Sequence, residues 1–146
     1  MLLSKSCIYG IRASIYLAVN QDRHYIPIKE IAKRLNISFH FLTKILQVLT
    51  KEQIIKSIKG PNGGVILNQS ADKLTIYDIV FAIDGSEIFD ECVLGLPGCS
   101  DANPCPLHRI WRVTKEELKS ELKSESLQNL ANQIKEGSIR LYDVYL

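Results

Sequence analysis

Residues 28–68 carry the pattern on which the fold prediction rests: IKEIAKRLNISFHFLTKILQVLTKEQIIKSIKGPNGGVILN. Apolar residues at helical spacing predict one helix over Ile28–Leu35 and another from Phe39 to about Lys51. Asn36 is expected to end the first helix, and Ser38 is expected to cap the second. Two helices joined by so tight a turn form a helix-turn-helix, although a plain helical hairpin would show the same pattern.

The residues that follow favour the DNA-binding interpretation. Strands are predicted over 54–59 and 65–68, joined by a Gly- and Pro-rich turn. A hairpin directly after the second helix is a wing, and Lys56 and Lys59 flank its tip, within expected reach of phosphates or a minor groove. The chain is therefore predicted to be mainly α-helical with a small β-hairpin, a winged helix-turn-helix.

Further helices are expected on both sides of this unit. The pattern predicts helices over 4–20, capped by Ser4 or Ser6, over 75–83, from about 108 onward, and over 127–135. A cysteine-bearing loop separates the second of these from the third. The predicted organisation is a DNA-binding domain over 1–86, a cysteine-rich cluster-binding loop over 87–107, and a dimerisation helix with a C-terminal helix over 108–146.

The helix that follows the loop has a narrow apolar stripe with a densely charged outer face. The stripe consists of Ile110, Trp111, Leu118 and Leu122. It is expected to pack on the same helix of a second copy, and the resulting two-fold symmetry predicts a pseudo-palindromic operator in double-stranded DNA. The alternative is that the stripe packs against the first helix of its own chain.

Charge is distributed unevenly along the 146 residues. Residues 1–70 carry ten Lys or Arg and three Asp or Glu, a net charge of +7, whereas residues 71–107 carry one Lys and seven acidic residues, a net charge of −6. A basic N-terminal half suits a polyanion such as DNA better than a protein partner. We see no membrane-spanning apolar run, no signal peptide and no small-molecule site, so a cytoplasmic location without a membrane partner is expected.

Three of the four cysteines lie close together in the sequence. Cys92, Cys99 and Cys105 are separated by six and five residues, and His108 follows three residues after the last. Thiolates are soft donors that suit iron–sulfur clusters or zinc, and these wide spacings leave room for more than one ion. His108 is either a fourth ligand or a solvated residue at a helix start. Cys7, on the first helix, is expected to be a core or surface residue.

A Cys–His pair such as Cys105 and His108 also occurs in enzymes with a nucleophilic cysteine. Such a site needs a third group that orients the base, and an oxyanion site. The sequence indicates neither, so we predict that the chain is not an enzyme.

The chain resembles the Rrf2 family of bacterial transcription regulators over nearly its whole length. The resemblance rests on residues 31–38, on the wing segment 58–64, on the helix 75–84, and on the pattern Cys-x6-Cys-x5-Cys-x2-His-x2-Trp over 92–111. It implies a homodimer that binds palindromic promoter DNA, usually as a repressor. It also implies a [2Fe-2S] or [4Fe-4S] cluster that senses oxygen, nitric oxide, iron or redox state.

The branch that regulates iron–sulfur cluster biogenesis is the most similar, because it also has a histidine three residues after its third cysteine. The resemblance implies Cys92, Cys99, Cys105 and His108 as ligands of a [2Fe-2S] cluster, in preference to a [4Fe-4S] cluster. The first cysteine gap is six residues here and five in that branch. A Cys7 contributed by the partner subunit is the alternative fourth ligand, and a zinc or thiol-based sensor is the alternative chemistry.

The same resemblance points to a set of DNA contacts. His40, Phe41 and Thr43 match its base-reading positions, with Thr43 in place of a glutamate, and Lys59 stands where its wing carries an arginine. Lys44 and Lys59 are expected to contact phosphates, and His40 and Thr43 to influence sequence choice. The full predicted DNA-binding set is Ser38, His40, Phe41, Thr43, Lys44, Lys56, Lys59, Gly60 and Asn62.

Overall fold

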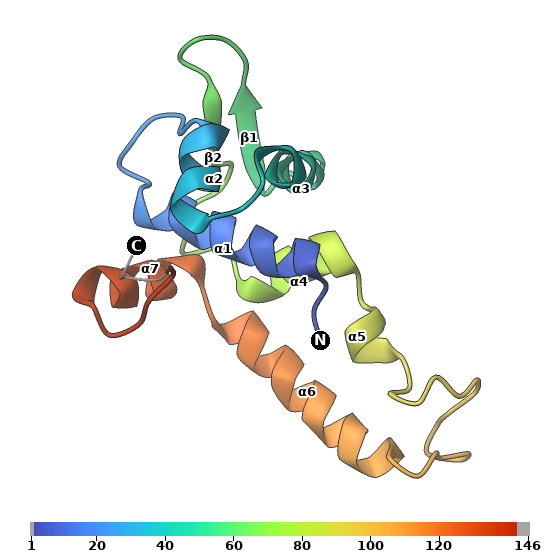
Figure 1. Ribbon diagram of the computed structural model, residues 1–146. Helices are drawn as coiled ribbons and strands as arrows, with labels where there is room; N and C mark the ends of the chain where they lie inside the picture. Colours follow the sequence, from blue (N-terminus) through green and yellow to red (C-terminus); the bar gives the residue numbers. More distant parts are fainter. Residues whose placement is uncertain (1, 143–146) are drawn as a thin grey trace.

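The computed structural model describes residues 2–142, which form a mostly helical protein with one hairpin (Figure 1). The elements, in chain order, are α1 Lys5–Val19, α2 Ile28–Leu35, α3 Phe39–Lys51, β1 Ile55–Ile58, β2 Gly64–Leu67, α4 Ile76–Asp84, α5 Glu87–Asp90, α6 His108–Ser124 and α7 Leu127–Glu136. The first four helices and the hairpin cluster together. The α6 helix runs along the opposite side of the molecule from the hairpin, with the cysteine loop at its far end.

The helix-turn-helix forms as its local signals predict. Asn36 ends α2 in the left-handed conformation, with φ of 54°, and Ile37 N donates to Ala32 O at 2.9 Å. Ser38 then caps α3 by accepting a hydrogen bond from the amide of Phe41. The apolar faces of α2 and α3 meet in a core whose fully buried members include Ile31, Leu35, Leu42, Leu46 and Leu49.

The wing is a two-stranded antiparallel sheet in which Ile55 pairs with Leu67 and Ile58 with Gly64. Both strands differ from the predicted bounds by one residue at each end: β1 spans Ile55–Ile58 instead of 54–59, and β2 spans Gly64–Leu67 instead of 65–68. Ile26, in the segment between α1 and α2, pairs with Val65 of β2 through two reciprocal backbone hydrogen bonds of 2.9 Å. This pairing attaches the wing to the rest of the domain.

Gly64 is required by this attachment. A Cβ at this position would lie 2.2 Å from the carbonyl oxygen of Ile26, and φ is +156°. Gly64→Ala is therefore expected to lower the free energy of unfolding by about 1–3 kcal/mol, because backbone atoms must separate to make room. Chemical denaturation measures the loss. Gly60→Ala, in the same hairpin, is strained by its φ of +113° but meets no atom within 4 Å of its added Cβ, so it lacks the backbone clash and should cost less. Equal losses would contradict the explanation.

The N- and C-terminal helices complete the domain. Ser4 caps α1, and α7 packs along α1 with Leu127 and Ala131 fully buried. Thr75 and Asp78 form a capping box that begins α4 at Ile76, and α5 is a short helix that the sequence did not predict. Across residues 2–142, no helix combines the length and the apolar character that crossing a membrane would need.

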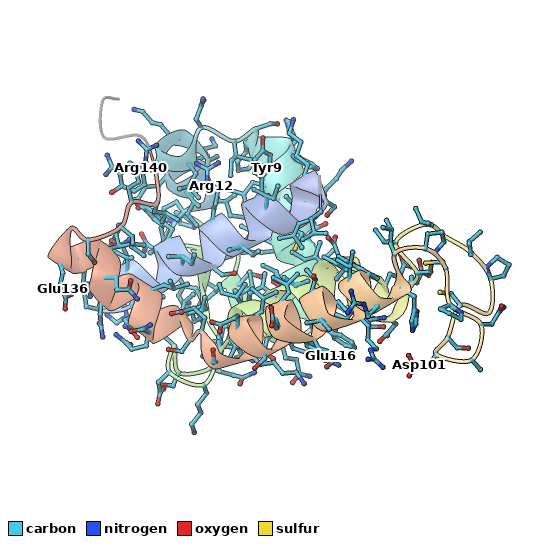
Figure 2. The ribbon with its side chains drawn as sticks, turned by 90° about the horizontal axis from the view of Figure 1, so that it is seen from below. Tyr9, Arg12, Asp101, Glu116, Glu136 and Arg140 are labelled. Carbon is cyan, nitrogen blue, oxygen red and sulfur yellow. The ribbon has the colours of Figure 1, made fainter. Side chains whose placement is uncertain are left out.

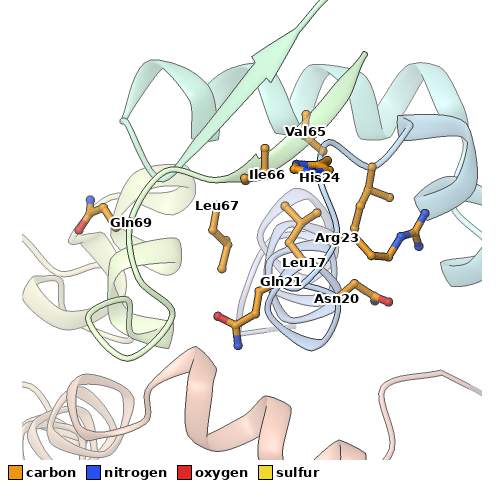
Figure 3. A pocket seen from close by; sticks show the side chains of 10 residues that line it. Leu17, Asn20, Gln21, Arg23, His24, Val65, Ile66, Leu67 and Gln69 are labelled. Atoms are coloured by element: carbon orange, nitrogen blue, oxygen red, sulfur yellow. The ribbon is translucent and has the colours of Figure 1, made fainter. Parts of the chain in front are cut away.

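A small pocket lies between the end of α1 and β2, beside the Ile26–Val65 pairing (Figure 3). Asn20, Gln21, Arg23 and His24 line it on the side of the turn. None of the residues predicted to bind DNA or metal belongs to it.

The α6 helix packs mainly against α4 and α5. Leu118 and Leu122, half-buried, contact the core of their own chain, and Trp111 Nε1 donates to the carbonyl of Glu91 at 2.9 Å. Ile110 is different, because 61% of its surface is exposed. Four residues expected to form a single stripe therefore divide between an inner face and an exposed position. Figure 2 shows α6 from below, with Asp101 on the loop beyond its end.

Candidate metal centre and nucleic-acid interface

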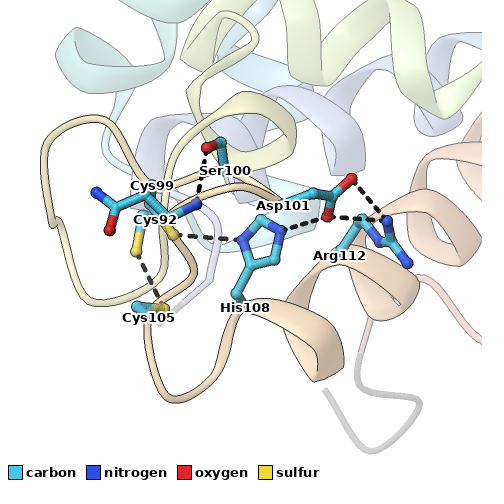
Figure 4. A network of polar contacts seen from close by, with 8 residues as sticks. Cys92, Cys99, Ser100, Asp101, Cys105, His108 and Arg112 are labelled. Carbon is cyan, nitrogen blue, oxygen red and sulfur yellow. Dashed lines mark hydrogen bonds and ion pairs between the residues drawn. The ribbon is translucent and has the colours of Figure 1, made fainter.

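The loop between α5 and α6 brings three thiols together (Figure 4). The sulfur atoms of Cys92, Cys99 and Cys105 all lie within 4.8 Å of one another, and those of Cys92 and Cys105 are 3.6 Å apart. Gly95 and Gly98 adopt positive φ values of 70° and 68°, which let the loop turn back on itself. The three cysteines that the sequence placed in one group thus share one site.

His108 reaches the same site from the first residue of α6. Its Nδ1 lies 3.3 Å from Cys99 Sγ, and its backbone amide donates to Cys105 O at 3.1 Å. The other ring nitrogen, Nε2, lies 2.9 Å from Oδ1 of Asp101. Arg112, one turn further along α6, donates to both carboxylate oxygens of Asp101 at 2.9 and 3.0 Å. The three thiols therefore share one centre, and the imidazole of His108 lies beside it, in contact with Cys99.

The electrostatics of the loop favour the anionic forms of Cys92 and Asp101, whereas desolvation and the neighbouring thiols raise the pKa of Cys99. The backbone amides of Leu96 and Leu94, with hydrogen bonds from the other two thiols, lower the pKa of Cys92 to about 7. The hydrogen bond from His108 and the charge of Arg112 lower the pKa of Asp101 below its ordinary value. A thiol close to deprotonation at neutral pH is suited to bind a metal or to react with an oxidant.

Cys7 lies outside this group; of the two places predicted for it, the core or the surface, it occupies the core. It is completely buried on α1, and burial, together with the nearby Asp84 carboxylate, raises its pKa to about 12. A protonated and inaccessible thiol is a poor metal ligand.

The second helix of the helix-turn-helix, α3, is the recognition helix of this fold, and the residues predicted on it differ in exposure. His40 and Lys44 are exposed on α3, whereas Thr43 is half-buried and its hydroxyl donates to Phe39 O at 2.8 Å. Phe41 packs edge-on against Tyr9 of α1, with ring centroids 5.5 Å apart. Phe41 therefore has a clear structural role, and Ser38 is engaged as the helix cap.

The wing projects beside this helix. The side chains of Lys56, Lys59 and Asn62 and the backbone of Gly60 are exposed along it. A groove between α3 and the wing is lined by Phe39, Thr43, Gln47, Ile58 and Lys59, among others. Phe39 and Ile58, 38% and 50% exposed, are apolar groups on a surface otherwise suited to phosphates.

Sequence reasoning missed four residues of these two sites. Phe39 does not share the helical spacing of the buried residues of α3, which was a usable sign that its side chain is exposed. The alternation of side chains along β1 would likewise have indicated that Ile58 is exposed. Asp101 and Arg112 gave no such sign, because charged residues on a loop and on a helix surface are ordinarily solvated.

Comparisons with known proteins agree on one family. The model of the Rrf2 family, described as an iron-dependent transcriptional regulator, matches residues 3–133. A protein of Aquifex aeolicus provisionally described as an HTH-type transcriptional regulator is 34% identical over 90% of this chain and 92% of its own length. The HTH-type transcriptional regulator IscR of Photorhabdus laumondii is 29% identical over 90% of this chain and 80% of its own. These relatives are named as regulators, in agreement with the prediction that the chain is not an enzyme.

Solved structures share the fold. CymR of B. subtilis, titled the global cysteine regulator, superposes with a TM-score of 0.76 at 28% identity, covering 89% of this chain and 95% of its own. IscR of T. potens gives a TM-score of 0.76 at 24% identity, covering 94% of this chain and 90% of its own. The predicted winged-helix fold is confirmed.

Proposed function

Because the chain belongs to the Rrf2 family of transcriptional regulators, we propose that it is a homodimeric repressor whose binding to pseudo-palindromic promoter DNA is controlled by an iron–sulfur cluster. One observation carries the proposal: three thiols lie within 4.8 Å of one another. The relatives named IscR support the choice of cofactor.

The donor set fits a cluster of the [2Fe-2S] type. Cys92, Cys99 and Cys105 supply three soft thiolate ligands, and the Nδ1 atom of His108, 3.3 Å from Cys99 Sγ, supplies a fourth donor. Cys7 of the partner subunit is the weaker candidate, since this thiol is fully buried in its own chain. A bound cluster supplies one-electron redox chemistry and sensitivity to oxidants.

The chain itself links this site to the DNA reader. His108 is the first residue of α6, and its side chain contacts Cys99, so this residue links the thiols of the loop to the start of the helix. The α6 helix packs on α4, and α4 packs on α3, the recognition helix. A change in the order of the loop is thereby transmitted through packed helices to the spacing of the two recognition helices in the dimer.

A thiol switch without a cluster is a second candidate function. The sulfur atoms of Cys92 and Cys105 are 3.6 Å apart, and CymR shares the fold. Two thiols at this separation can form a disulfide by giving two electrons and two protons to an oxidant such as hydrogen peroxide. Zinc held by the same thiols is a further possibility for this second candidate.

Anaerobic purification followed by an absorption spectrum and by iron and sulfide analysis separates these candidates. We expect visible charge-transfer bands with about two irons and two sulfides per chain; about four of each would indicate a [4Fe-4S] cluster instead. A protein that stays colourless after anaerobic reconstitution would refute the cluster. Zinc analysis and thiol counts before and after peroxide treatment would then distinguish the remaining alternatives.

DNA contacts are expected to divide into two kinds. Lys59→Ala removes one phosphate contact, so it should weaken binding to all sequences similarly and reduce the slope of log affinity against log salt by about one. Thr43→Ala should instead reduce discrimination at one base-pair position by about 1 kcal/mol. Fluorescence anisotropy at several salt concentrations, on sequences selected from a random library by the unmodified protein, measures both effects.

Lys135→Ala is the matched control for this pair. Lys135 is an exposed lysine at the end of α7, on the side of the domain away from the wing (Figure 1). It should leave both the affinity and the salt slope unchanged. If Thr43→Ala weakens every sequence equally, the assignment of base-reading positions on α3 is wrong.

A further inference from the structure

Asp101 occupies an unusual place beside the candidate cluster site. It lies on the loop between Cys99 and Cys105, yet its carboxylate contacts two residues of α6 (Figure 4). Oδ1 lies 2.9 Å from His108 Nε2, and both oxygens accept hydrogen bonds from Arg112 at 2.9 and 3.0 Å. The imidazole of His108 is thus held between a carboxylate on one side and a thiol on the other.

We propose that Asp101, itself held by Arg112, is a positioning residue that makes Nδ1 of His108 the metal-ligating atom. This inference rests on the function proposed above.

The chemistry of the imidazole supports this assignment. A neutral imidazole has one N–H donor and one nitrogen lone pair, and an ionised carboxylate can only accept. The contact with Asp101 therefore places the proton on Nε2. The lone pair then resides on Nδ1, the nitrogen that faces Cys99 Sγ at 3.3 Å. A carboxylate bonded to the outer nitrogen of a ligating histidine fixes its tautomer and ring orientation, and increases its strength as a donor.

Arg112 completes the arrangement. It follows His108 by four residues, so both side chains lie on the same face of α6. The Asp101 carboxylate therefore fastens the cysteine loop to two successive turns of the helix. The Asp101 and Arg112 side chains are 71% and 50% exposed, respectively, so their ion pair contributes little to stability. Variants at these positions are accordingly expected to fold.

The first test identifies the ligating nitrogen directly. Protein reconstituted with a cluster is prepared with histidine carrying ¹⁵N only at Nδ1 or only at Nε2, and the reduced cluster is studied by pulsed electron paramagnetic resonance. The chain has three histidines, and His108→Ala identifies the relevant signal. We expect strong coupling from the Nδ1 label. Strong coupling from the Nε2 label would overturn the proposal.

The second test addresses Asp101 itself. Asp101→Ala should shift the reduction potential of the cluster upward, since the imidazole becomes a weaker donor, and should speed cluster loss to a chelator about tenfold. Asp101→Asn keeps an acceptor for Nε2–H and should retain the Nδ1 coupling, which separates the hydrogen bond from the charge. Asp22→Ala, at an exposed aspartate in the turn after α1, is the control and should leave both quantities unchanged.

The outcomes distinguish this inference from the proposed function. If His108→Ala alters the spectrum and Asp101→Ala behaves like Asp22→Ala, the role of Asp101 is refuted while the cluster stands. If His108→Ala changes nothing, the fourth ligand and the inference both fail. If the protein takes up no iron, the same variants are compared with Co²⁺ as the probe. Asp101→Ala must then move the Co²⁺ absorption bands in the same direction as His108→Ala, and unchanged bands overturn the proposal.

Discussion

Cys99→Ala is expected to abolish retention of iron and sulfide after anaerobic reconstitution. Cys99 contributes one of three clustered thiolates and is the thiol that contacts His108 Nδ1 at 3.3 Å. Its removal leaves two thiols and one imidazole, too few protein ligands to hold a cluster against chelators. The measurement is the iron and sulfide content per chain. In parallel, DNA affinity should no longer differ between reconstituted and cluster-free protein.

Cys7→Ala is the control for this experiment, because it removes a cysteine from the same chain without touching the loop. It should retain full iron and sulfide content. A loss of about 1 kcal/mol in the free energy of unfolding is expected, since Cys7 is completely buried. If Cys7→Ala loses the cluster while the protein remains folded, Cys7 is a ligand and the assignment of His108 must be revised.

Ile110→Glu is expected to convert the proposed dimer into a monomer and to reduce affinity for a full palindromic site by at least about 100-fold. Ile110 is 61% exposed on α6, and Val113, one turn further on, is 50% exposed. A charge buried at the proposed helix–helix contact would be unpaired. A monomer also loses the effective concentration with which one bound subunit delivers the other to its half-site. Sedimentation velocity measures the state, and titrations with full and half sites measure the affinity.

Two controls make this result specific. Ser120→Glu introduces the same charge at an exposed polar position of α6 and should remain dimeric. Leu118→Ala should lower the free energy of unfolding, because Leu118 contacts the core of its own chain. A dimeric Ile110→Glu variant would show that another surface joins the two copies.

The exposure of Ile110 illustrates where pattern-based prediction reached its limit. The apolar spacing of α6 correctly identified a helix. It could not divide the predicted apolar stripe between the chain's own core and a partner, because both surfaces exclude water and select the same residue types. Packing against α4 places Leu118 and Leu122 inward and leaves Ile110 outside.

The sequence by itself determined the elements whose signals are local. Asn36 and Ser38 end and begin helices through hydrogen bonds to residues within four or five positions, so their effect is readable in a short window. The turn over 60–64 predicted the wing for the same reason. The cysteine site was also predictable, because a short loop with two turning glycines keeps its three thiols close together.

Only the tertiary structure decided the contacts between residues distant in the chain. The pairing of Ile26 with Val65, the burial of Cys7 near Asp84 and the packing of Phe41 on Tyr9 each depend on how whole elements are placed. Asp101 shows the same for function, since it acquires its partners only when α6 begins beside the loop. Local hydrogen bonding specifies each element, whereas the burial of apolar faces determines which elements meet.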